Sequence, residues 1–438
     1  MKKILFQFIL MLPAAMVFAQ DDVYPTTEAR GSQLIRNATI HVGNGQVINN
    51  GMIKIKDGKI EEVGANLTAA ADAIVIDAKG KHIYPGLILS NSTLGLVEMG
   101  SGSGRPMNDA AEIGDMNVSV RSIVAYNADS KIINTLRSNG ILLANSVPRG
   151  GMISGRSSVV QLDAWNWEDA CYSMDNGLHF NMPNLLIRPN PFQQFFAQQQ
   201  QPNAADALRN ALSRIENVKS FFRQAKGYFA QANKTETNLK FEAVRGLFEK
   251  KQKFFVHCDL VKEMLIAIEF AKEFGFDVVI IGGSESWQIA NLLKQNNIAV
   301  ILGQQHALPT LADDDVDQPY KSATALQQAG VLYAINDDDP QNRGRNLPFN
   351  AGTAAAYGIT KEEALTAITL NPAKILGIDN RTGSIEAGKD ANLVICEGDI
   401  LDMKSSIVTD AFIQGRKINL TDKHKQLYER YKHKYNLK

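Results

Sequence analysis

The chain has 438 residues, of which 45% are hydrophobic, so it is long enough for one large globular domain together with a smaller one. Lys and Arg together number 46 and Asp and Glu together number 46. This balance excludes binding to nucleic acid or to an anionic membrane by bulk charge. Three cysteines far apart in the sequence, Cys171, Cys258 and Cys396, make a disulfide framework improbable.

The first nineteen residues have the pattern of a secretory signal peptide. Two lysines follow Met1, an apolar run covers residues 4–19, and small residues precede a cleavage site after Ala19. A transmembrane anchor is the weaker alternative because Gln7 and Pro13 interrupt a short apolar run. We therefore expect a mature protein that is periplasmic or secreted, with no membrane span.

Short alternating strands are predicted near both ends of the chain. Residues 34–42, 51–56 and 59–64 alternate in polarity, with an Asp57-Gly58 hairpin turn between the last two. A second set covers residues 383–395 and 408–418. Neither set is large enough to form a core alone, so we expect them to pair into one small composite β-sandwich.

The centre of the chain has apolar runs that alternate with helical patterns, as a parallel α/β barrel requires. Seven such runs are found, at residues 85–93, 140–146, 158–162, 253–257, 277–282, 298–303 and 330–336. An eighth strand is either hidden near residues 183–188 or absent. A long amphipathic helix is expected at 206–250 after a Gln-rich insert at 193–201, and a terminal helix is expected in 421–438.

Two stretches of the chain contain recognisable motifs. Residues 84–93 read Tyr-Pro-Gly-Leu-Ile-Leu-Ser-Asn-Ser-Thr, and residues 383–394 read Gly-Ser-Ile-Glu-Ala-Gly-Lys-Asp-Ala-Asn-Leu-Val. Both resemble signatures of the amidohydrolase superfamily, imidazolonepropionase-like. The resemblance implies a TIM-like (β/α)8 barrel over 85–374 and a composite β-sandwich from 33–84 and 375–420. It also implies hydrolysis of a C–N bond in an amide or cyclic amide.

The chain departs from the family where metal ligands are expected. The first barrel strand in the family ends in Asp-x-His-x-His, but here Leu89, Asn91 and Thr93 occupy those positions. Gly282 stands where the sixth strand would supply another histidine. The resemblance therefore implies a secreted subgroup with a degenerate metal site, in which Asn91 and Thr93 would contact substrate instead.

Two candidate residues survive from the family pattern. His257 ends the run 253–257, and the resemblance implies that it is a metal ligand. Asp338 follows the last run, and the resemblance implies that it contacts metal and transfers a proton, with Asp337 and Asp339 as alternatives of register. The alternative interpretations are that His257 is a hydrogen-bonded structural histidine and that the acidic run forms a turn before a proline.

Further candidates are weaker. His306 follows the seventh run and could lie near the barrel mouth, whereas His179 falls in a segment that reads as irregular. Arg343 and Arg345 could hold a substrate carboxylate, or could be solvated loop residues.

Two functions from different classes remain open. The first is an exported hydrolase with a reduced metal site, holding a single divalent ion (Zn, Mn or Fe) or none. The second is a catalytically inactive homologue that binds a ligand or pairs with an active paralogue. Either protein would take a small molecule and could form a homo-oligomer.

Overall fold

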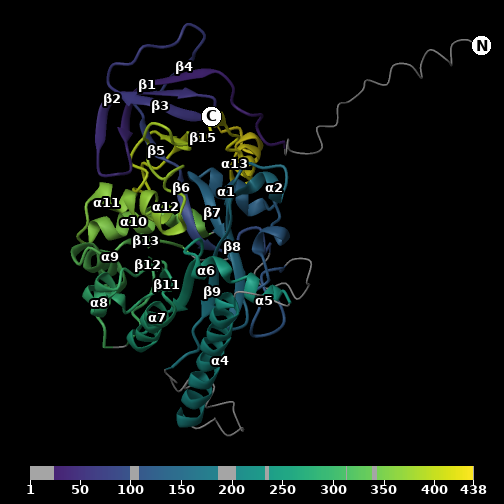
Figure 1. The fold of residues 1–438 in the computed structure, drawn as a ribbon. Helices are drawn as coiled ribbons and strands as arrows, with labels where there is room; N and C mark the ends of the chain where they lie inside the picture. Colours follow the sequence, from purple (N-terminus) through teal and green to yellow (C-terminus); the bar gives the residue numbers. More distant parts are fainter. Residues whose placement is uncertain are drawn as a thin grey trace, which may run out of the picture.

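The computed structural model describes residues 24–98, 108–185, 204–231, 236–311, 313–337 and 343–437. Its two sheets are stacked end to end, with the sheet from the chain termini above the barrel (Figure 1). The expected signal peptide and the Gln-rich insert lie outside the described residues.

The terminal sheet is a composite of both ends of the chain. Its order is β16-β15-β14-β5-β1-β2-β3, and β4 pairs with β1. The N-terminal and C-terminal strands meet where β5 pairs antiparallel with β14. Its strands are β1 (Ser32–His41), β2 (Val47–Lys56), β3 (Lys59–Gly64), β4 (Ile74–Asp77), β5 (His82–Pro85), β14 (Leu393–Cys396), β15 (Val408–Ile413) and β16 (Arg416–Lys417).

This sheet encloses a core of its own. The β2–β3 hairpin turns at Asp57 and Gly58, which both have positive φ, as the sequence predicts. The hairpin then contacts the segment before β14, where Ile60 N donates to Lys389 O over 2.8 Å. The separate cluster of buried residues inside includes Ile35, Ile53 and Phe412. The predicted composite β domain is thus confirmed.

The second sheet forms the barrel, in the order β13-β12-β11-β10-β9-β8-β7-β6. Neighbouring strands are parallel except β8, which is antiparallel to both β7 and β9. The strands are β6 (Leu87–Ser92), β7 (Ile141–Ser146), β8 (Ile153–Gln161), β9 (Cys171–Asn181), β10 (Lys253–Cys258), β11 (Val278–Gly282), β12 (Ala299–Leu302) and β13 (Tyr333–Ile335). The predicted barrel is confirmed, with one strand reversed.

A side chain joins the two edges of the barrel. Asn336, just after β13, accepts hydrogen bonds from Ser90 Oγ (3.2 Å) and from Asn91 N (3.1 Å) through Oδ1. Its Nδ2 donates to Asn91 O over 2.9 Å. The carboxamide of Asn336 thus supplies hydrogen bonds between the two edge strands, as backbone groups do between the other strands of the barrel.

The eighth strand is β9, which ends at Asn181, so it is neither absent nor placed at 183–188; residues 183–185 are not in a strand, and 186–188 lie outside the described residues. Cys171–Asn181 carries polar residues at Ser173, Asp175 and Asn176, which hide its strand character. Leu178 and Phe180 of β9 are fully buried, although the strand itself is polar, because the neighbouring strands β8 and β10 supply an apolar environment. Register with β10, in which His179 pairs with Phe255, then fixes which side chains reach the site.

Helices cover the barrel, and one end of the long helix α4 projects beyond it (Figure 1), whereas Val218 and Phe222 of the same helix are buried in the core. The predicted helix over 206–250 ends earlier, at Ala230, and two short helices follow. The helices are α1 (Lys131–Arg137), α2 (Trp167–Ala170), α4 (Ala204–Ala230), α5 (Leu239–Glu242), α6 (Arg245–Phe248), α7 (Val261–Phe274), α8 (Ala290–Gln295), α9 (Gln318–Gln328), α10 (Leu347–Ala356), α11 (Lys361–Thr366), α12 (Leu370–Leu376) and α13 (Lys423–Lys434), with 3-10 turns η2 (Ser122–Ala125), η3 (Ser286–Ile289) and η4 (Arg343–Asn346).

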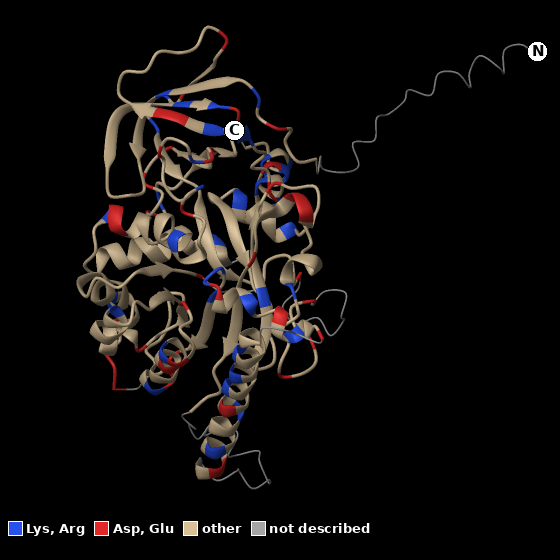
Figure 2. Cartoon of the chain, viewed as in Figure 1, with Lys and Arg blue, Asp and Glu red and all other residues tan. Residues whose placement is uncertain are grey.

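Acidic and basic residues are interspersed over the whole molecule (Figure 2). This agrees with the absence of net charge in the sequence. Within the described part of the chain, no helix is long and apolar enough to cross a bilayer.

Candidate functional site

A cavity of about 410 Å³ lies at the carboxyl ends of the barrel strands. In barrels of this kind that end of the strands carries the reactive groups. Its lining comes from β6, β10, β11 and β12 and from residues that follow β9, β10, β12 and β13: Asn91, Met182, Asn184, His257, Cys258, Asp259, Leu260, Glu263, Ile281, Gly282, Leu302, Gly303, Thr310 and Asn336.

His257 stands on the cavity wall, near the end of β10. Its Nε2 lies 2.9 Å from Nδ1 of His179, so one imidazole donates to the other. Burial, with a smaller contribution from the charge of Arg149, lowers the pKa of His257 to about 4. The ring is therefore neutral at physiological pH and can accept a proton.

His179 is the functional candidate that the sequence hides. It lies on β9, is fully buried, and stacks on Phe255 with ring centroids 4.7 Å apart. Burial holds its pKa well below the usual value, and its Nε2 has no hydrogen-bond partner among the described residues. The signal that would have found it is the run Leu178-His179-Phe180, a polar residue between two apolar ones, as in a strand with two different faces.

Of the two residues that replace the first-strand histidines, only Asn91 lines the cavity. Its backbone N–H and C=O are fixed by Asn336, as described above. Thr93 is 1% exposed and does not line the cavity, and its Oγ1 has no partner in the described part of the chain. Asn91 and His257 therefore line the same cavity, whereas Thr93 is buried outside it.

At Gly282 the backbone itself excludes a third ligand. Its φ is +97°, a conformation that L side chains rarely adopt. A Cβ there would lie 2.8 Å from Asp259 Oδ1 and 3.1 Å from Cys258 O. Asp259 is held in place by Ser284, whose Oγ and N donate to Oδ1 over 2.5 and 3.2 Å. Asp259 therefore occupies the space that a side chain at position 282 would need.

The acidic run after β13 is described only at its first residue. Asp338 and Asp339 lie outside the described residues, so the role predicted for Asp338 stays a prediction. Asp337 is 2% exposed and accepts a hydrogen bond from Asn350 Nδ2 over 3.1 Å. Asp337 thus ties the end of β13 to α10 and does not line the cavity.

Two other candidates with described side chains, His306 and Arg345, are not brought to His257. His306 is exposed, and its Nε2 lies 2.7 Å from Thr353 Oγ1. Arg345 Nη1 lies 3.4 Å from Nε2 of His424, on α13. Arg343 begins the turn η4, and its side chain is outside the described part.

A metal ion at this site would need several His, Cys, Asp or Glu side chains close together. Among the described residues no three His, Cys, Asp or Glu side chains are grouped so that they could hold an ion. A catalytic zinc site uses about three protein ligands and one open position. The side chains that are described thus do not fit the family's metal.

The remaining groups can still do acid–base and hydrogen-bonding chemistry. Nε2 of His257 is engaged by His179, which leaves Nδ1 as the nitrogen for proton exchange with the cavity. The carboxamide of Asn91 supplies one acceptor and two donor hydrogens next to it.

Comparison with known proteins agrees with the fold. Residues 284–418 match the family described as "Amidohydrolase family". The imidazolonepropionase of Thermoplasma volcanium is 41% identical over 86 residues, which are 19% of this chain and 21% of that protein. The imidazolonepropionase of Picrophilus torridus is 32% identical over 176 residues, 38% of this chain and 42% of that protein. The chain thus spans less than half the length of these curated relatives.

Solved structures extend the similarity to nearly the whole molecule. An amidohydrolase from Thermotoga maritima has a TM-score of 0.70 and 29% identity, covering 88% of this chain and 98% of that one. An adenosine deaminase from Xanthomonas campestris has a TM-score of 0.54 at 15% identity, covering 94% of this chain and 99% of that one, and this likeness concerns the fold alone.

Proposed function

Since the chain is an amidohydrolase homologue with the amidohydrolase fold, we propose that it hydrolyses a carbon–nitrogen bond in a small amide or cyclic amide. A cavity of about 410 Å³ has the size for a small molecule. The observation that carries the proposal is the His179–His257 pair, which presents a neutral imidazole to that cavity. The names of the imidazolonepropionase relatives support a cyclic amide as one substrate class.

The reaction follows from the position of each group. His257 takes a proton from water at Nδ1 while the water oxygen bonds to the amide carbon. As the C–N bond breaks, the same proton passes to the leaving nitrogen. This step requires the tautomer in which His257 Nε2 donates to His179 Nδ1, 2.9 Å away, because that tautomer leaves a free lone pair at Nδ1 of His257. Asn91 can donate to the oxygen on which negative charge develops.

A second candidate function is ligand binding without turnover, alone or beside an active paralogue. The observation that favours it is the lack of a three-ligand group among the described side chains. Both candidates use the same cavity, so they differ only in whether product forms.

We further propose that the protein is exported, with residues 1–19 removed as a signal peptide. The support is the charged start, the apolar run and the small residues before the cut. Cell fractionation and N-terminal sequencing test this, and a mature chain that still begins at Met1 in the cytoplasm contradicts it.

The function is tested on the mature chain, with metal content measured by mass spectrometry in the same preparation. Turnover is screened against lactams, N-acyl amino acids and dipeptides. We expect His257→Ala to lower kcat by about 100-fold or more, as for loss of a general base, and His306→Ala, an exposed histidine away from the cavity, to leave it unchanged. Equal loss in both variants contradicts the assigned role of His257.

An Asp338→Asn variant in the same screen tests the predicted proton transfer by Asp338. Unchanged turnover removes that residue from the mechanism. Binding of cavity ligands with no product from any substrate identifies the second candidate function.

A further inference from the structure

A second cavity of about 220 Å³ adjoins the first. The two share Asp259, Gly282, Leu302, Gly303 and Thr310 in their linings. The second continues from this shared wall to the segment after β12 and the start of α9, where Gln305, Asp314 and Gln318 line it. A molecule bound beside His257 therefore has room to extend in one direction, past Asp259.

The described residues that line this double cavity carry charge of one sign. They include the carboxylates of Asp259, Glu263 and Asp314, and they include no lysine or arginine. The guanidinium of Arg149 is close enough to affect the pKa of His257, but Arg149 lines neither cavity. Among the described lining residues, a carboxylate on the ligand would thus meet negative charge and no cation.

The N-terminus of α7, at the wall beside Asp259, is already occupied by side chains of the protein itself. Helix α7 begins after Leu260, and Glu263 accepts from Asp259 N and Leu260 N over 3.2 Å each. Glu285, 7% exposed, accepts from Val261 N over 2.8 Å. These two carboxylates use the N–H groups that would otherwise attract an anion.

Asp259 is the carboxylate that lines both cavities, whereas Glu263 lines only the first and Asp314 only the second. Ser284 binds only its Oδ1, and Oδ2 has no partner among the described residues. The residue is exposed at the wall common to both cavities. Because Oδ1 is fixed, Oδ2 is held in position without using up its hydrogen-bonding capacity.

Asn91 gives a second, independent sign of a ligand. It is 7% exposed and lines the first cavity, yet its side-chain carboxamide has no hydrogen-bond partner in the described part of the chain. Buried polar groups are normally paired, so a carboxamide left open at a cavity indicates that a bound molecule completes it. Another amide is the complementary partner, because each group has one donor side and one acceptor side.

We infer that the double cavity binds an amide that carries a cationic amine several atoms away, with Asn91 on the amide and Asp259 on the amine. This rests on the proposed function for the amide end and adds a substrate class to it. It also separates this site from one that recognises a substrate carboxylate, for which arginine is the usual partner.

The test uses three amides matched in chain length: 5-aminopentanamide, pentanamide and glutaramic acid, which are cationic, neutral and anionic. Binding to the mature chain is measured by calorimetry under conditions without turnover. We expect the cationic amide to bind about fivefold more tightly than the neutral one, as for a partly exposed ion pair, and the anionic one to bind most weakly.

Two variants assign the contacts. Asp259→Asn keeps the acceptor for Ser284 and should bring the cationic and neutral amides to equal affinity, whereas Asn91→Ala should weaken all three by a similar factor. Asp72→Asn, an exposed carboxylate in the terminal domain, is the matched control and should change nothing.

The result that overturns the inference is an anionic amide bound as tightly as the cationic one, or a preference that survives Asp259→Asn. Failure of all three amides to bind at millimolar concentration overturns it as well. Turnover is scored separately. A preference for the amine without any hydrolysis leaves this inference standing and refutes the proposed hydrolase, and hydrolysis without that preference does the reverse.

Discussion

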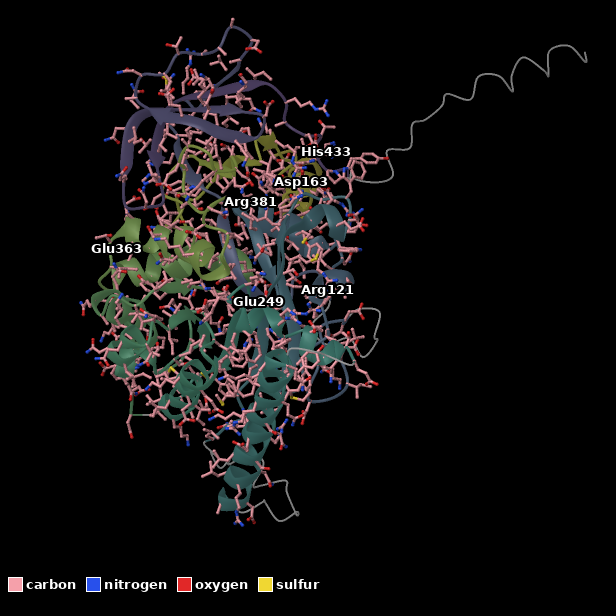
Figure 3. The ribbon with its side chains drawn as sticks, in the orientation of Figure 1. Arg121, Asp163, Glu249, Glu363, Arg381 and His433 are labelled. Carbon is pink, nitrogen blue, oxygen red and sulfur yellow. The ribbon has the colours of Figure 1, made fainter. Side chains whose placement is uncertain are left out.

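Two buried polar clusters in this molecule have opposite degrees of satisfaction. At the junction of the terminal sheet and the barrel, Asp390 accepts from Lys59 Nζ (2.9 Å), Tyr172 Oη (2.7 Å) and Arg381 Nη2 (3.0 Å). Figure 3 shows Arg381 at this junction. In the barrel, His179 and His257 have one hydrogen bond between them, and Nε2 of His179 has no described partner.

The difference separates structure from function. Burial raises the pKa of Asp390, but hydrogen bonds from Tyr172 and Lys59 lower it overall, so its charge is stabilised by neighbours that belong to both domains. The imidazole pair has no such support and stays neutral. The satisfied cluster holds the fold together, whereas in the imidazole pair His257 lines the cavity and is the member that a ligand can reach.

The largest effect is expected from removing the centre of the satisfied cluster. Asp390→Ala removes the acceptor of three hydrogen bonds, one of them from the largely buried Tyr172, and we expect the free energy of unfolding to fall by about 3 kcal/mol. Urea denaturation measures this. Asp72→Ala, on the exposed loop before β4, is the control and should stay within about 0.5 kcal/mol. Equal values for the two variants would mean that the Asp390 cluster does not stabilise the fold.

The next effect concerns the unsatisfied cluster and pH. An unfolded histidine takes up its proton near pH 6.5, but folded His257 does so only near pH 4. Between these values the unfolded chain binds more protons, so the free energy of unfolding falls as the pH is lowered. Denaturation at pH 7 and pH 4.5 should show this, and His257→Gln should reduce the fall by about 2 kcal/mol.

Exposed His306 gives the control for the pH experiment. His306→Gln should leave the pH dependence as it is in the unmodified chain. A fall that is the same in the unmodified chain and in His257→Gln would assign the acid sensitivity to other groups.

A smaller effect is expected at the cavity wall. Gly282→Ala places a Cβ against Asp259 and requires a left-handed φ, so we expect a loss of about 1.5 kcal/mol in the free energy of unfolding. Gly303 lines the same cavity with open space around it, so Gly303→Ala is the matched control. A harmless Gly282→Ala would show that Asp259 can move away from the wall.

The smallest change in stability should come from His179→Leu. This variant removes a buried nitrogen without a partner but also leaves His257 Nε2 without its partner, so the two effects oppose each other and the free energy of unfolding should change by less than about 1 kcal/mol. Turnover, or amide affinity in its place, should fall because His257 loses the group that orients it. Destabilisation as large as that of Asp390→Ala would place His179 among the structural residues and end the contrast between the clusters.

The frame of the molecule was predictable from local patterns. The Asp57-Gly58 hairpin, the pairing of both termini and the Pro85-Gly86 start of the barrel are each written in a few adjacent residues. Strand β9 was missed because its polar residues belong to a strand whose environment is supplied by β8 and β10. No pattern within residues 171–181 predicts that environment.

The site was predictable only in part. His257 and Asn91 follow from the ends of strands, and both line the cavity. The partner of His257 is 78 residues away in sequence, so it depends on the register between β9 and β10. The conformation of Gly282 and the place of Asp259 against it are likewise properties of the folded backbone.

The backbone at Gly282 limits which side chains this position can accept. A histidine introduced there would have to reshape the turn and displace Asp259 before its ring could reach the cavity. A substitution at position 282 alone therefore carries a cost in stability before it adds any chemistry. We expect an imidazole at this position to be tolerated only together with a second change that makes room at Asp259.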